Sequence, residues 1–95
     1  MIAREGDSYF LEGPVTMATV QAALAEWRQL FEGPQVRVDL SRVSEVDSAA
    51  VSLLLEWVRT AARAGWTTHY SQFNRNLKSL AVLYGVTDLI PGVDD

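Results

Sequence analysis

The pattern of apolar and polar positions predicts strands in three parts of the chain, two of them by strict alternation. Val36, Val38 and Leu40 alternate with two charged residues, which indicates a strand with one buried face. Residues 66–71 alternate in the same way and are rich in β-branched and aromatic side chains, which favour strands. Residues 8–11 combine aromatic and apolar side chains suited to an earlier strand. We therefore expect strands at all three places.

Apolar residues recur every three to four positions in three longer stretches, a spacing that places them on one face of a helix. These stretches are residues 20–31, 48–64 and 74–84. The hydroxyl of Thr16 or Thr19 is expected to cap the first helix, and the side chain of Asn74 the third. Glycine or proline follows each stretch and ends the helix. These terminating residues are Gly33, Pro34, Gly65 and Gly85.

A polar turn, residues 41–47, joins the strand around Val38 to the second helix. Val43 and Val46 are expected to anchor this turn in the core, while its other side chains stay in water. The turn ends in Asp47, and Ser48 follows; both are residue types that cap a helix and lie at its positive end. We expect any functional site to lie at this junction.

The order of the predicted elements indicates the fold class. Strands alternate with helices from Val15 onward, and such crossover connections are typical of a parallel or mixed sheet. Residues 1–95 show no repeat, low-complexity segment or linker, and their length suits one domain. The sequence therefore predicts a single α/β domain, a mixed sheet with helices packed on it.

Composition narrows the functional classes. The formal net charge of −4 and the scattered positions of the eight basic residues argue against nucleic acid as a partner. The chain has no cysteine, which excludes disulfides, thiolate ligands and a cysteine nucleophile. Its longest apolar-rich run, residues 49–55, is interrupted by Ser52 and is much shorter than the roughly 18 to 20 residues of a membrane span. We expect no direct membrane insertion, no cofactor and no metal.

Few residues offer catalytic chemistry. His69, the single histidine, lies on a predicted strand with no base or nucleophile beside it in the sequence. Glu45 and Asp47 could form a carboxylate pair, although the helix dipole alone favours acidic residues at this position. Ser48 has two interpretations: a simple helix cap, or a hydroxyl whose position stabilises an added phosphate or a partner's acidic group. We expect no enzymatic activity.

The stretch LSRVSEVDSAAVSLLLEWVRTAARAG, residues 40–65, resembles the central signature of STAS domains, a family that includes bacterial anti-sigma-factor antagonists. In that family a strand and a polar loop lead to Asp-Ser/Thr-x-Gly and an apolar helix. The resemblance implies a STAS-type α/β fold over nearly the whole chain. It also places Ser48 at the position that is phosphorylated in the antagonists. Ala50 replaces the family's glycine, and its β-carbon weakens the case for a phosphorylation switch.

Two stretches, VDLSRVSEVDS and SLAVLYGVTDLIPG, make the chain most similar to the STAS subunits of Mla-type phospholipid-transport ABC transporters. This similarity implies a non-catalytic cytoplasmic subunit that binds the transporter's ATPase. Through the ATPase it would associate with the permease, peripherally at the inner membrane, and help to maintain outer-membrane lipid asymmetry. The alternative is an anti-sigma-factor antagonist that is switched by phosphorylation of Ser48.

The resemblance also implies where the partner binds. Ser48 matches a functionally important threonine of the transporter subunits, so the start of the second helix is the expected contact surface. Its residues are Asp47, Ser48, Ala49, Ala50 and Ser52. The solvent-facing residues of the third helix, residues 74–84, are expected to add to this surface.

Overall fold

A computed structural model describes residues 2–30 and 34–93. Along the chain, its elements are β1 (Ile2–Glu5), β2 (Ser8–Leu11), β3 (Gly13–Val15), α1 (Val20–Leu30), β4 (Gln35–Asp39), β5 (Val43–Val46), α2 (Ser48–Arg63), β6 (Thr67–Ser71), α3 (Arg75–Leu83) and the 3-10 helix η1 (Thr87–Leu89). The predicted helices are all present within a residue or two of their expected bounds. The predicted last residue of α1, Phe31, and the terminator Gly33 lie outside the described residues.

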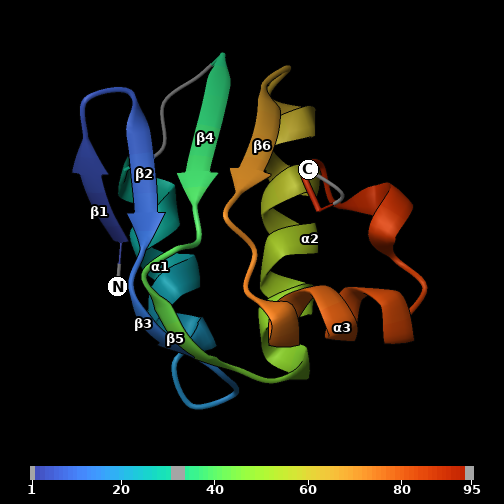
Figure 1. Cartoon of the computed structure of the whole chain (residues 1–95). Helices are drawn as coiled ribbons and strands as arrows, with labels where there is room; N and C mark the ends of the chain where they lie inside the picture. Colours follow the sequence, from blue (N-terminus) through green and yellow to red (C-terminus); the bar gives the residue numbers. More distant parts are fainter. Residues whose placement is uncertain (1, 31–33, 94–95) are drawn as a thin grey trace.

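Four strands form the main sheet in the order β1-β2-β4-β6. β2, β4 and β6 are parallel to one another, and β1 is antiparallel to β2. Figure 1 shows α1 and α2 behind this sheet, each connecting one parallel strand to the next. The architecture confirms the predicted α/β class with a mixed sheet.

The alternation of side chains along the strands explains the core. Val36 and Val38 on β4 and Tyr70 on β6 are at most 2% exposed. Arg37 and His69, which alternate with them along the strands, face solvent. The hydroxyl of Tyr70 donates a hydrogen bond of 2.7 Å to the backbone carbonyl of Leu54, and this bond joins the sheet to α2. Trp27 and Trp57 are also buried in the core.

Two strands correct the prediction. The segment 41–47, expected to be a turn, contains β5, which pairs in parallel with β3 in a separate two-stranded sheet. Val43 is buried and Val46 half-buried, so both anchor the segment as expected, but as residues of a strand. β1 was not among the predicted strands. A turn at Gly6, whose φ is 62°, instead pairs it with β2.

The C-terminal segment differs from the prediction at one position. Tyr84 ends the stretch predicted as the third helix, but it follows α3 as the C-cap residue and is 52% exposed. Beyond η1, Ile90 and Val93 return to the core. The carbonyl of Pro91 accepts a hydrogen bond of 3.1 Å from the amide of Tyr70, so this segment covers part of the outer edge of β6.

Candidate functional site

The start of α2 is held in place by Asp47. One carboxylate oxygen, Oδ1, accepts the amide of Ala49 at 2.8 Å and so caps the helix. The other, Oδ2, accepts the amide of Met17 at 3.0 Å. Because Met17 lies in the segment before α1, Asp47 fixes this segment against the N-terminal end of α2.

The hydroxyl of Ser48 is available to a partner. Ser48 is the first residue of α2, and it is exposed. The structure assigns the cap to Asp47, so the interpretation of Ser48 as a simple cap is wrong. Among the described residues, the Ser48 hydroxyl has no hydrogen-bond partner. It therefore lies at the positive end of a helix with its donor and acceptor capacity unused.

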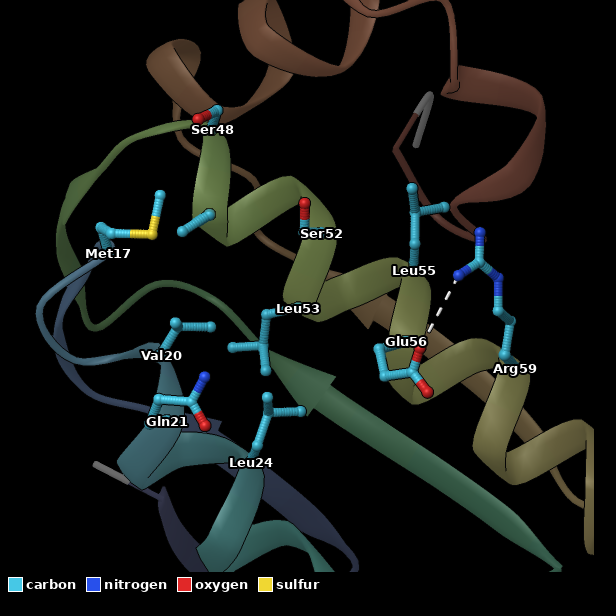
Figure 2. A pocket seen from close by; sticks show the side chains of 11 residues that line it. Met17, Val20, Gln21, Leu24, Ser48, Ser52, Leu53, Leu55, Glu56 and Arg59 are labelled. Atoms are coloured by element: carbon cyan, nitrogen blue, oxygen red, sulfur yellow. Dashed lines mark ion pairs between the residues drawn. The ribbon is translucent and has the colours of Figure 1, made fainter.

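An open groove of about 570 Å³ runs beside Ser48 between α1 and α2. Figure 2 shows Ser48 and Ser52 one turn apart along α2, with Met17, Val20 and Leu24 facing them from the α1 side. The groove is lined by Met17, Val20, Gln21, Leu24, Ser48, Ala49, Ser52, Leu53, Leu55, Glu56 and Arg59. It has an apolar floor with polar groups along α2, a combination suited to holding part of another protein.

The five expected contact residues do not share one environment. Ser48 and Ser52 are exposed, and Asp47 is half-buried. Ala49 is 6% exposed at the floor of the groove, and Ala50 is 1% exposed within the core. The prediction that Ala50 contacts a partner is therefore wrong, because core side chains surround its only side-chain atom.

The burial of Ala50 also changes the argument about phosphorylation. Its β-carbon points into the core, so it affects how α2 packs and leaves the approach to Ser48 open. The replacement of the family's glycine therefore does not count against modification of Ser48.

Other features of the groove were not predicted. Met17 is 71% exposed, which is unusual for a methionine, and it extends over the groove in Figure 2. At the other end, Glu56 and Arg59 form an ion pair of 3.7 Å. The threonines expected to cap α1 hold the preceding turn, because the Thr19 hydroxyl accepts the amide of Thr16 at 3.0 Å. This turn carries Met17, which lines the groove with α2 residues only because α1 packs against α2.

A second charged cluster lies near β1 and β2. Arg42 contacts Glu5 and Glu12, each at 2.8 Å, and its guanidinium lies 3.9 Å from the ring centre of Phe10. The hydrogen bond to Glu5, with that to Glu12, raises the pKa of Arg42 above its ordinary value. The three charged side chains are 38% to 58% exposed, so the cluster joins the strands without forming an enclosed site.

Residues considered for catalysis do not converge on the groove. His69 is exposed on β6, and Glu45 is exposed on β5. Within residues 2–30 and 34–93, no three histidine, aspartate or glutamate side chains are grouped so as to bind a metal ion. The helices of the described part are also too short or too polar to cross a membrane.

Comparison with known proteins gives a family and a fold. A family model described as "Mlab, STAS domain" matches residues 7–91. No curated protein matches the chain. Among solved structures, the chain is similar to the anti-sigma factor antagonist SpoIIAA in its unphosphorylated form. The TM-score is 0.73 at 14% sequence identity, over 97% of this chain and 85% of that one. This similarity concerns the fold.

The chain is also similar to part of a longer protein, Mglu. The TM-score is 0.61 at 28% identity, over 79% of this chain and 20% of that one. A native form of Mglu gives a TM-score of 0.51 at 23% identity, over 73% and 22%. The chain thus spans about a fifth of the Mglu chain. Since the family model covers most of the sequence, the chain belongs to the STAS-domain family described as Mlab.

Proposed function

We propose that the chain is a non-catalytic STAS subunit that binds the ATPase of an Mla-type phospholipid-transport ABC transporter and supports its activity. Through the ATPase it associates with the permease, on the cytoplasmic side of the inner membrane and without entering the bilayer. In this role it contributes to outer-membrane lipid asymmetry. The family description motivates the choice of transporter.

The observation that supports this proposal most directly is the exposed hydroxyl of Ser48 beside the groove, which bonds to none of the described residues. A partner residue can bond to this hydroxyl while an adjacent apolar side chain enters the groove between α1 and α2. Asp47 fixes the positions of the two sides of the groove relative to each other, because it accepts hydrogen bonds from the amides of Ala49 and Met17. The surface is therefore formed before the partner arrives, which lowers the entropic cost of binding.

Copurification with the ATPase tests the proposal. The wild-type chain is expected to bind the ATPase and to raise its rate of ATP hydrolysis. Ser48→Arg is expected to weaken binding about tenfold or more, because a long charged side chain obstructs the groove. Ala62→Arg is the matched control, since Ala62 is an exposed residue near the other end of α2. Absence of both binding and stimulation by the wild-type chain would refute the transporter role.

An anti-sigma-factor antagonist switched at Ser48 is the second candidate. The exposure of Ser48 at the first position of α2 supports it, and the buried Ala50 does not obstruct the hydroxyl. A phosphate there would add about two negative charges at the positive end of α2. Incubation with a partner kinase followed by intact mass measurement tests this candidate. A mass gain that Ser48→Ala abolishes would support the switch, and an unchanged mass would count against it.

A further inference from the structure

α3 has an exposed apolar side that the rest of the domain does not cover. The helix buries Leu77 and Ala81 against the core. Its other side leaves Val82 65% and Leu83 74% exposed, and Tyr84 follows at 52%. Figure 1 shows α3 lying across the end of the domain toward which β4 and β6 point. Two large apolar side chains on one short helix and a third at its C-cap, all exposed, indicate a contact surface.

The shape of this side is suited to a second helix. Ser79 and Leu83 line two separate hollows, one of about 710 Å³ and one of about 320 Å³. The larger hollow is completed by Phe73, Arg75, Lys78 and Val82, and the smaller by Val46, Asn76 and Leu80. Residues four apart form a ridge on a helix. The hollows on either side of this ridge can receive the side-chain ridges of another helix.

The charge of α3 indicates the chemistry of that helix. α3 contains two of the eight basic residues, Arg75 and Lys78, and none of the twelve acidic ones. Both side chains are exposed, and neither forms an ion pair with another described residue. A positive, apolar surface on a chain of net charge −4 favours an acidic, apolar partner.

We propose that the α3 face, defined as Arg75, Lys78, Ser79, Val82, Leu83 and Tyr84, binds an amphipathic helix of another protein. Acidic residues of that helix flank its apolar stripe and contact Arg75 and Lys78. The proposal does not require the partner to be an ATPase, and the face does not include Ser48.

Two other occupants fit the observations less well. A symmetric contact between the α3 faces of two copies would supply basic residues from both sides and no acidic group for Arg75 and Lys78. An anionic membrane would gain only about 1 kcal/mol from each of two basic residues. The hollows beside the ridge are also suited to receiving side chains.

Two synthetic helical peptides of about 15 residues test the proposal. Both carry leucines at helical spacing; one has glutamates beside the leucine stripe and the other has lysines. Each is titrated into the full chain, and amide chemical shifts are followed by NMR. The glutamate peptide is expected to shift the amides of residues 75–84 and to bind about tenfold tighter than the lysine peptide. Lys78, the chain's single lysine, should then react more slowly with an amine acetylating reagent.

Three variants sharpen the test. Arg75→Glu with Lys78→Glu should remove the preference for the glutamate peptide, and Leu83→Gln should weaken both peptides. Arg37→Glu with Arg63→Glu makes the same charge change at exposed positions on β4 and α2, and should keep the preference.

Equal binding of both peptides, or no shifts in residues 75–84, would overturn the proposal. Binding to phosphatidylglycerol vesicles without binding to either peptide would overturn it in favour of a membrane surface.

Discussion

Asp47 joins two segments that are 30 residues apart in the chain. Its two carboxylate oxygens make different bonds, one to the Ala49 amide within α2 and one to the Met17 amide before α1. These bonds can be separated by substitution, because asparagine keeps one oxygen acceptor but replaces the other with a donor. The cap and the connection to Met17 therefore make separate contributions.

We predict that Asp47→Ala lowers the free energy of unfolding by about 1 to 2 kcal/mol, the usual cost of losing an N-cap. Asp47→Asn should cost less than about 0.5 kcal/mol, because the cap remains and the exposed Met17 amide can bond to water. Urea denaturation of the two variants measures the difference. Equal losses would show that the contact with Met17 carries most of the stabilisation.

At Ser48, stability and binding are expected to separate. Because its hydroxyl makes no bond within the described residues, Ser48→Ala should change the free energy of unfolding by less than about 0.5 kcal/mol. The same variant should weaken ATPase binding roughly threefold to tenfold, the range that corresponds to one hydrogen bond. Thermal unfolding and a binding titration, made on the same preparation, test both parts. A large loss of stability would show that the serine is structural.

At the scale of elements, the helices were predictable because their signals are local. Asn74 caps α3 through a bond to the amide of Leu77, three residues away, and Gly65 follows α2 with φ of 79°. β5 and β1 were not predictable in the same way. β5 is a short strand among polar residues, and its partner, β3, lies about 30 residues earlier.

The same distinction applies to the candidate site. The position of Ser48 at the start of α2 follows from the sequence around it. The groove does not, because Met17 and Leu24 reach Ser52 only when α1 packs against α2. The burial of Ala50 likewise depends on which face of α2 meets the sheet. Contacts between distant segments therefore account for what sequence analysis missed.

The segment that closes over β6 gives a prediction at this scale. Gly92 has φ of 96°, and a β-carbon there would overlap the backbone carbonyl oxygen of Tyr70. Gly92→Ala should cost at least about 2 kcal/mol of unfolding free energy, from backbone strain and from displacement of the segment. Gly65→Ala is the control, because its φ is also positive but no atom lies within 4 Å. Chemical denaturation should show the larger loss for Gly92→Ala.

For the whole molecule, Tyr70 connects the layers. Its hydroxyl bonds to Leu54 in α2, its ring meets Phe73 edge-on with centroids 6.3 Å apart, and its amide bonds to Pro91. Complete burial raises the pKa of the Tyr70 phenol well above its ordinary value. The folded state thus keeps a proton that the unfolded state releases near pH 10.

This difference makes stability depend on pH in one direction. The contribution of the protonated Tyr70 phenol to the free energy of unfolding is complete below about pH 10. It declines as the pH rises toward the pKa of the folded state, because the unfolded chain then binds fewer protons than the folded one. We predict that Tyr70→Phe lowers the unfolding free energy at neutral pH by about 1 to 2 kcal/mol and makes its decline above pH 10 shallower. Tyr84→Phe, at an exposed position, should change neither quantity. Urea denaturation at neutral pH and above pH 10 measures these effects. If the unfolding free energy of Tyr70→Phe declined as steeply above pH 10 as that of the wild type, groups other than Tyr70 would be responsible for the loss of stability.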